Sequence, residues 1–348
     1  MKKLNTILLF LGLSFLAYLL WEVGPHELWQ PVKALGWGVI PLILSEGAAN
    51  FAHTLGWRHC IKSTHPPTRL PRLFRIAMAG FAINYLTPSA SMGGEVTKAS
   101  LLASNHKGPE AVSSVLMDKL CMAFAHLLLA VLGSLFLLWR VSLPVQLWIA
   151  MAVSSGLLTG GMVTFLLMQK HGKLGGFLRW LVDHKVGGRA LERAAQQIAE
   201  VDQALKAFYR ERPLDLLLSV GWHLLGHAVA IFQVWLFLYL LHQPAPLASV
   251  LAAAFLGLWI DLLTFAVPLN LGALEGSRIV ALKAVGCGAA LGMAFGVAIR
   301  VAQVFWAAFG LINYGLLAAQ LPPSAAGKTG LPASAAWQRI TGRSVVIK

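Results

Sequence analysis

Residues 291–318, LGMAFGVAIRVAQVFWAAFGLINYGLLA, decide the fold class of this chain. A single charged residue, Arg300, interrupts the run. An α-helix needs about 20 predominantly apolar residues to cross the hydrocarbon core of a bilayer. The stretch therefore predicts a membrane-spanning helix. Because a charge at membrane depth is costly, Arg300 is expected to have a partner or a function.

The same pattern recurs along the whole chain. Of its 348 residues, 57% are hydrophobic and 12% are charged, whereas about a quarter are charged in ordinary soluble domains. The mean hydropathy of +0.68 agrees with this composition and argues against a soluble enzyme. Five further runs have spanning length: 4–22, 34–57, 112–139, 144–168 and 213–241. We expect one all-α polytopic membrane domain over residues 1–320, with about six full spans.

Two further apolar stretches, about 70–87 and 247–267, are followed by matching interrupted segments. These read PSASMGGEVTK (88–98) and PLNLGALEGSR (268–278), and both fit Pro-x6-Glu-x2-(Lys/Arg). Helix breaks inside a membrane are tolerated where protein or water covers the exposed backbone. The pattern predicts two re-entrant helical hairpins whose second arms are short helices near 93–104 and 273–285. The residues expected to break the helices are Pro88, Gly93, Gly94, Pro268 and Gly272.

The net charge of +14 is concentrated in particular connecting segments. Basic residues gather near the N-terminus, in 58–75, in 169–212 and in the tail, while 23–33, 140–147 and 242–247 are nearly free of them. By the positive-inside rule, both termini are expected to be cytoplasmic. The two hairpins then enter from opposite faces, which predicts an inverted repeat of halves 1–140 and 144–320. Basic residues form no stripe with interleaved aromatics, so no nucleic-acid partner is expected.

Two segments outside the spans have distinct compositions. Residues 188–210 have helical composition and mixed charge, which favours a cytoplasmic amphipathic helix that links the halves. Residues 321–348 are rich in Pro, Ala and Ser, which predicts a disordered cytoplasmic tail.

The repeated motif supplies the candidate site. In each copy, Glu95 or Glu275 begins a short helix, and Lys98 or Arg278 follows three residues later on the same face. Each pair is interpreted either as a structural clamp or as the lining of a polar translocation path. Further charges in apolar helices join the candidate set: Asp118, Lys119, Arg300 and Asp261. Asp261 is interpreted as an ion-pair partner for Arg278 or Arg300, with a proton-linked carboxylate as the alternative.

Other polar residues have less specific interpretations. His223 and His227 are four residues apart on one helix face, where helix–helix hydrogen bonding is favoured over a metal site. Glu46 and Asn50 are interpreted as interior-facing, with a polar contact between helices as their simplest role. Trp57 and the other tryptophans near predicted helix ends are interpreted as interfacial anchors. No metal or cofactor is expected, and no ATPase or hydrolase motif is found in its required context.

The stretches NYLTPSASMGGEVTKASLL (84–102) and LGALEGSRIVAL (271–282) resemble the two signature segments of the lysylphosphatidylglycerol synthase transmembrane, or flippase-like, family. The resemblance covers about 1–320, includes Asn84 in the first segment, and extends to stand-alone members, some of them associated with hopanoid synthesis. It implies an inner-membrane translocase for anionic or aminoacylated lipids. The sequence ends at Lys348 without the family's soluble aminoacyl-transfer domain, so we do not expect aminoacyl-lipid synthesis.

The function predicted from the sequence is therefore non-enzymatic lipid translocation in a bacterial cytoplasmic membrane, either passive or ion-coupled. Its expected partners are a membrane lipid and, in addition, enzymes of lipid or envelope synthesis. Two alternatives stay open: an embedded transferase that acts on a lipid-linked substrate, and a non-transporting scaffold of a lipid, hopanoid or cell-envelope synthesis complex.

Overall fold

The computed structural model describes residues 25–61, 68–86, 92–104, 108–140, 210–264 and 270–320, together with isolated positions such as Phe208 and Val267. These residues form helices and turns, without a strand among them. The spans predicted at 4–22 and 144–168 and the linker helix at 188–210 lie outside the described residues, apart from isolated positions. The tail at 321–348, Pro88 and Pro268 lie outside them as well.

The first half of the described chain contains six elements. They are α2 (Pro25–Leu35), the short 3₁₀ helix η1 (Gly36–Gly38), α3 (Val39–Cys60), α4 (Leu70–Leu86), α5 (Met92–Leu102) and α6 (Gly108–Arg140). The second half contains α10 (Pro213–Leu240), α11 (Leu247–Leu263), α12 (Ala273–Ala284) and α13 (Ala289–Ala318).

Four helical segments in the described part are long and apolar enough to cross a membrane: Trp29–Cys60, Glu110–Trp139, Pro213–Leu240 and Ala289–Ala318. They correspond to four of the six predicted spans. The prediction of an all-helical integral membrane protein is confirmed, whereas the number of six spans stays a prediction.

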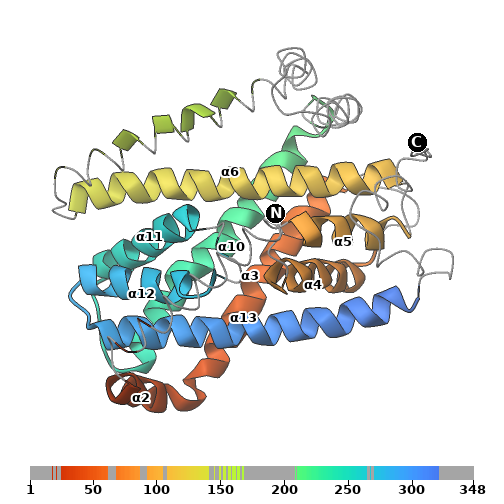
Figure 1. Cartoon of the computed structure of the whole chain (residues 1–348). Helices are drawn as coiled ribbons and strands as arrows, with labels where there is room; N and C mark the ends of the chain where they lie inside the picture. Colours follow the sequence, from red (N-terminus) through yellow and green to blue (C-terminus); the bar gives the residue numbers. More distant parts are fainter. Residues whose placement is uncertain are drawn as a thin grey trace, which may run out of the picture.

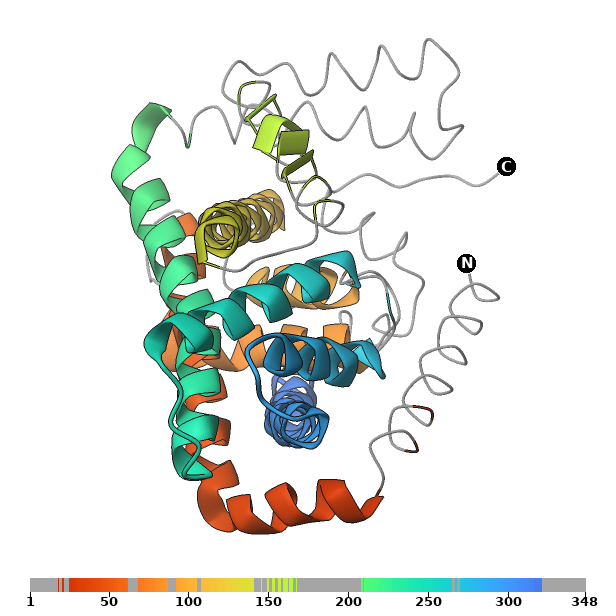
Figure 2. The same cartoon turned by 90° about the vertical axis from the view of Figure 1, so that its left-hand side faces the viewer.

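Two long helices frame the two helical hairpins (Figure 1). The α4–α5 pair lies between α6 and α13 at one end of the molecule, and the α11–α12 pair lies between them at the other. Helices α3 and α10 pack closely together and cross the other elements along one side (Figure 2). Each hairpin thus contacts both framing helices, and the Glu and Lys or Arg of its motif are largely buried in the bundle.

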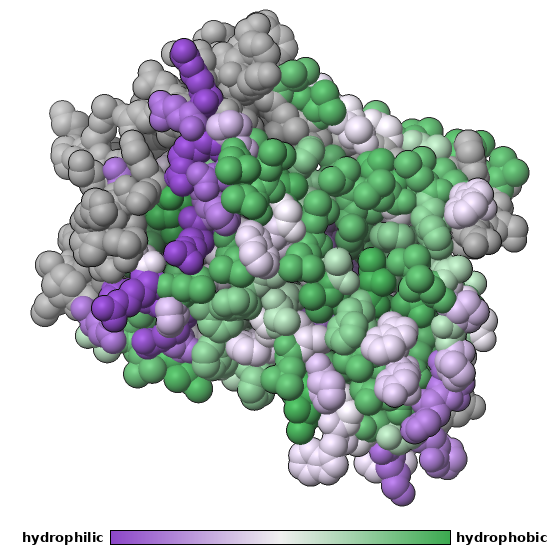
Figure 3. Space-filling view, turned by 180° about the vertical axis from the view of Figure 1, so that it is seen from behind, coloured by the Kyte–Doolittle hydropathy of each residue, from purple (hydrophilic) through white to green (hydrophobic). Residues whose placement is uncertain are grey.

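The buried apolar side chains form two main clusters, one around each hairpin. Phe237, Leu282 and Phe295 belong to the cluster around α11 and α12. Leu73 and Leu102 belong to the cluster around α4 and α5. Large apolar side chains also cover the outside, and Figure 3 shows a broad hydrophobic face with hydrophilic residues at opposite edges. Such an extensive exposed apolar surface fits a protein whose solvent is lipid.

Glycines permit the closest helix contacts. A Cβ atom at Gly310 of α13 would lie 2.1 Å from the carbonyl oxygen of Met78 in α4. One at Gly47 of α3 would lie 2.1 Å from the Trp306 ring. Small residues at such crossings are typical of membrane helix packing, where van der Waals contact supplies much of the association energy.

Candidate functional site

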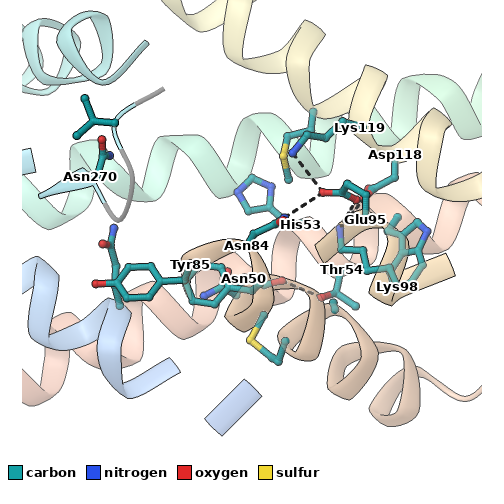
Figure 4. A pocket seen from close by; sticks show the side chains of 17 residues that line it. Asn50, His53, Thr54, Asn84, Tyr85, Glu95, Lys98, Asp118, Lys119 and Asn270 are labelled. Carbon is teal, nitrogen blue, oxygen red and sulfur yellow. Dashed lines mark hydrogen bonds and ion pairs between the residues drawn. The ribbon is translucent and has the colours of Figure 1, made fainter. Parts of the chain in front are cut away.

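A polar cavity of about 320 Å³ lies beside the first hairpin. Side chains from α3, α4, α5, α6 and α13 line it, together with Val267 and Asn270 from the segment before α12. Figure 4 shows Glu95, Lys98, Asp118 and Lys119 gathered at one end of this cavity, with Tyr85 and Asn270 toward the other. A cavity of this volume is within the range of small-ligand sites.

Four charged side chains form one network at the cavity. The Lys98 ammonium lies 3.4 Å from Glu95 and 3.2 Å from Asp118, and the Lys119 ammonium lies 3.2 Å from Glu95. Asp118 is almost fully buried, with 2% of its side chain exposed, whereas Lys119 is 45% exposed. The predicted Glu95–Lys98 pair is therefore present, and Asp118 and Lys119 extend it.

Close contacts between α4 and α5 fix the two arms of the first hairpin relative to each other. The Gly94 N–H donates to Asn84 Oδ1 at 2.6 Å, and Asn84 Nδ2 donates to Glu95 Oε1 at 3.3 Å. A Cβ at Gly94 would lie 2.1 Å from the Gly80 carbonyl oxygen. Gly93 and Gly94 lie within α5, which begins at Met92. Gly94 thus permits the close approach of α4, and the N-terminal dipole of α5 favours the Glu95 carboxylate.

Three uncharged cavity-lining residues carry buried polar atoms without a hydrogen-bond partner among the described residues: Asn50 Nδ2, Trp57 Nε1 and Asn270 Oδ1. Buried polar groups nearly always have partners, so these atoms are available to hydrogen-bond with a polar ligand in the cavity. Trp57 is 1% exposed, and the Lys98 ammonium lies over its ring, 5.2 Å from the ring centroid. Its interpretation as an interfacial anchor was wrong, because the face of α3 that carries it turns toward the bundle interior.

The second motif forms different pairs. Arg300 donates to both oxygens of Glu275, and Glu275 also accepts from the Gly272 N–H at 3.0 Å. Arg278 pairs with Asp261 at 2.8 Å, and Asp261 also accepts from the Ser277 hydroxyl at 2.8 Å. Glu275 therefore pairs with Arg300, and the expected Glu275–Arg278 pair is replaced.

Local geometry explains this exchange of partners. Gly272 has a φ of 72°, a conformation that favours glycine, and it is the N-cap of α12. Glu275 caps this helix start and so turns away from Arg278. The Arg278 guanidinium instead occupies the space left by Gly257, where a Cβ would lie 2.5 Å from Nη1. The sequence interpretation of Asp261 as a partner of Arg278 agrees with this geometry.

The structure thus separates the predicted site residues into two groups. Asn84, Glu95, Lys98, Asp118 and Lys119 line the polar cavity. Asp261 and Arg278 line a separate cavity of about 40 Å³, and Glu275 lines neither. Arg300 reaches the rim of the large cavity, donating to the Asn270 carbonyl at 2.9 Å and to Tyr85 at 3.4 Å.

Histidines form a buried cluster next to the charged network. His53 and His223 share a hydrogen bond of 2.9 Å between their Nδ1 atoms, and His223 Nε2 lies 3.0 Å from Asp118 Oδ1. His227 contacts the His53 ring, and His126 contacts the His227 ring. The predicted hydrogen bond between helices is present for His223. Elsewhere on the same helices, Gln233 donates to Glu46 at 2.9 Å, which is the predicted polar contact.

Sequence reasoning missed several cavity residues, namely His53, Trp57, Tyr85, Asn270 and Gln303. A signal was present for two of them. Asn50, His53, Thr54 and Trp57 follow the spacing i, i+3, i+4 and i+7, which places them on one face of α3. A polar stripe on an otherwise apolar membrane helix predicts an interior polar site.

The two hairpins share more than the motif. Asn84 and Asp261 occupy the same position, the fifteenth of 17 residues, in α4 and α11. Gly80 and Gly257 also correspond, and each makes room for the basic residue of its motif, Lys98 or Arg278. In both halves the motif glutamate pairs with a cation on the following long helix, Lys119 or Arg300.

Comparison with known proteins identifies the family of this chain. A family model described as the lysylphosphatidylglycerol synthase TM region matches residues 5–311. A UPF0104 membrane protein of Methanothermobacter thermautotrophicus is 30% identical over 135 residues, which cover 38% of this chain and 40% of that protein. No solved structure matches significantly. Because the family model covers most of its length, this chain belongs to the family of the lysylphosphatidylglycerol synthase TM region.

Proposed function

We propose that this protein is a lipid translocase that moves an anionic or aminoacylated phospholipid, or a similar polar-headed lipid, across a cytoplasmic membrane. One observation carries the proposal: a polar cavity with two lysines and two carboxylates lies inside an apolar helical bundle. A head group would enter this cavity, while its acyl chains stay in the surrounding lipid. The protein would change only the position of the lipid, without covalent chemistry.

The donors that line the cavity favour an anionic head group. Lys98, Lys119, Asn50 Nδ2 and Trp57 Nε1 all present N–H groups there. Lys119 is the most exposed charge of the network and has only Glu95 as an ion-pair partner among the described residues. It can therefore turn toward a phosphate at low cost. The Lys98 ammonium lies deeper, so it would bind a head group that has entered fully.

The matched contacts of the two hairpins support an inverted-repeat mechanism. Inverted-repeat transporters place broken helices near the membrane midplane and expose the site alternately to each side. The equivalent glycines, motif glutamates and cations in the two halves are consistent with two copies of one inverted unit. In this proposal both termini are cytoplasmic, and the movement is passive or coupled to an ion gradient.

A scaffold in a lipid- or envelope-synthesis complex is the second candidate, and the second hairpin favours it. Its pairs Glu275–Arg300 and Asp261–Arg278 are closed, and its cavity is small. A scaffold needs such clamps but has no use for a charged cavity. The first hairpin therefore distinguishes the two candidates.

The test is lipid movement in proteoliposomes that contain the purified protein. Fluorescent phosphatidylglycerol and fluorescent phosphatidylcholine are compared by reduction of the outer-leaflet probe. The double variant Lys98→Met/Asp118→Leu removes a buried ion pair without leaving a charge unpaired, which preserves folding. We expect the wild type to move phosphatidylglycerol faster than phosphatidylcholine. In the double variant, we expect phosphatidylglycerol to move at about the rate of protein-free liposomes.

A matched control is Lys283→Met, which removes an exposed lysine from the last turn of α12. It should move lipid like the wild type. Equal lipid movement in well-folded Lys98→Met/Asp118→Leu protein would refute the site. Wild-type protein that moves neither lipid would favour the scaffold.

A further inference from the structure

The polar cavity is electrically balanced in the structure. The two lysines, Lys98 and Lys119, are matched by the two carboxylates, Glu95 and Asp118. A monoanionic head group that entered this cavity would leave one uncompensated negative charge in a low-dielectric interior. Uncompensated buried charge is expensive, so a second, positive charge should accompany the head group.

The histidine cluster is the neighbouring group that can accept that charge. His223 is fully buried and contacts both His53 on α3 and Asp118 on α6. His53 lines the cavity, where Figure 4 shows it beside the charged network. The cluster thus connects the cavity to the carboxylate that holds Lys98.

The packing around these two rings is reciprocal. A Cβ at Gly56 of α3 would lie 2.7 Å from His223 Nε2, and one at Gly226 of α10 would lie 2.6 Å from His53 Cε1. Each helix therefore carries a glycine opposite the histidine of the other helix. This arrangement holds the two rings 28° from parallel, with a centroid distance of 5.2 Å, and brings the two Nδ1 atoms together.

The contact between the two Nδ1 atoms carries a single proton, because one nitrogen must donate and the other must accept. If the Asp118 carboxylate, 3.0 Å away, keeps the proton of neutral His223 on Nε2, then His53 Nδ1–H is the donor to His223 Nδ1. When His53 gains a proton on Nε2, its Nδ1 proton can pass to His223. The Nε2 proton of His223 can then pass to Asp118 Oδ1, which becomes a neutral carboxylic acid.

We propose that this protein couples lipid movement to protons: a His53–His223–Asp118 relay takes up one proton for each monoanionic head group that binds. This inference rests on the proposed translocase function. Protonation of Asp118 removes the deeper partner of Lys98 and leaves Lys98 available to the anion. The cavity with one proton and one head group is again electrically balanced, so both can cross together.

Other ionisable groups around the relay set its environment. On the elements packed against His53 and His223, these groups are Glu95, Lys98, Asp118, Lys119, His126, His227, Cys60 and Cys121. Of these, Asp118 is the carboxylate in contact with His223. The relay therefore ends at Asp118.

Calorimetry on purified protein in detergent tests the coupling without requiring transport. Soluble dihexanoyl-phosphatidylglycerol is titrated into the protein in buffers of different ionisation enthalpy, which yields the number of protons taken up per bound head group. We expect uptake of about one proton, so that the affinity falls about tenfold per pH unit above neutrality. Asp118→Asn, which removes the final proton acceptor, should bind the lipid with little proton uptake. His223→Gln and His53→Gln, which break the path to that acceptor, should slow the uptake in a stopped-flow measurement with a pH indicator.

His59→Gln is the matched control. His59 also joins α3 to α10, through Asp215 at 2.9 Å, but at the far end of the helix and outside the cavity lining. This variant should keep the proton uptake of the wild type. Binding without proton uptake in the wild type, unchanged uptake in Asp118→Asn, or an unchanged rate of uptake in His223→Gln would overturn the relay while leaving the translocase intact. Failure of the wild type to bind the anionic lipid would overturn both.

Discussion

The two hairpins place the same motif in opposite circumstances. At the α4–α5 hairpin, Lys98 and the neighbouring Lys119 of α6 share two carboxylates at the edge of a cavity of about 320 Å³. At the α11–α12 hairpin, Arg278 and the neighbouring Arg300 of α13 each have their own carboxylate, and the adjacent cavity is about 40 Å³. The first arrangement can exchange partners with a ligand, whereas the second is already complete.

The choice of cation matches this difference. Arginine presents a planar fork that fits a carboxylate through two parallel hydrogen bonds, as Arg300 does with Glu275. Lysine is a compact charge on a flexible stem, and it changes partners easily. If the two halves of the repeat were once equivalent, the first hairpin would have kept a role in ligand binding, whereas the ion pairs of the second would have become structural.

The largest effect is expected from removal of the cation on the long helix. Arg300→Ala leaves Glu275, which is 1% exposed, as a buried unpaired charge, and should cost about 3–5 kcal/mol of stability. The equivalent Lys119→Ala should cost below about 1 kcal/mol, because Lys119 is 45% exposed and Glu95 keeps Lys98. Thermal unfolding in detergent would measure both variants. Equal destabilisation would contradict the division into a clamp and a working hairpin.

A smaller effect on stability is expected at the paired glycines. A Cβ at Gly80 would lie 2.7 Å from Lys98 Cγ and 3.0 Å from the Gly94 carbonyl oxygen, and that backbone atom cannot move away easily. Gly80→Ala should therefore cost about 1–3 kcal/mol. The Cβ of Gly257→Ala would meet only the mobile end of Arg278, so this variant should unfold within a few degrees of the wild type. A larger loss at Gly257 than at Gly80 would reverse the comparison.

The fold was largely predictable, because its signals are local. The runs at 112–139, 213–241 and 291–318 correspond to α6, α10 and α13, since length and hydropathy suffice to define a membrane helix. The short arms were predicted at 93–104 and 273–285 and observed as Met92–Leu102 and Ala273–Ala284. Gly272 marks the start of α12 in the sequence itself, whereas Gly93 and Gly94, which were predicted to break the helix, lie within α5.

The site was predictable only in part, because it depends on partners far apart in sequence. Glu95 and Lys98 are three residues apart on one helix, so their contact follows from the helical period. The same reasoning failed for Glu275 and Arg278, where Gly272 and Gly257 decide the partners. The contact between His53 and His223 joins residues 170 positions apart, and no local pattern specifies it.

A third comparison concerns lipid movement, where Asp118→Asn should raise the activation barrier for phosphatidylglycerol by about 1.4 kcal/mol. Asp118→Asn keeps the shape of a side chain that is 2% exposed, but removes the charge that holds Lys98 and faces His223. We expect phosphatidylglycerol movement in proteoliposomes to slow by about tenfold. Asp261→Asn removes the matching charge beside Arg278 and should change the rate by less than about twofold. Equal slowing in both variants would indicate that the two hairpins work together at the site.

The smallest effect is expected from Arg278→Lys, which tests whether the second hairpin needs the geometry of arginine or only its charge. The guanidinium donates to Asp261 at 2.8 Å and to the Ser277 hydroxyl at 3.1 Å, and a lysine could keep one of these contacts. Asp261 would retain the Ser277 hydroxyl as a donor, so its carboxylate would not be left unpaired. The expected loss is below about 1 kcal/mol, the range of partly exposed ion pairs, with lipid movement unchanged. Measured in the same proteoliposomes, a strong loss of phosphatidylglycerol movement by folded Arg278→Lys would place the forked donor of the second hairpin in the translocation path. The clamping role assigned to that hairpin would then be wrong.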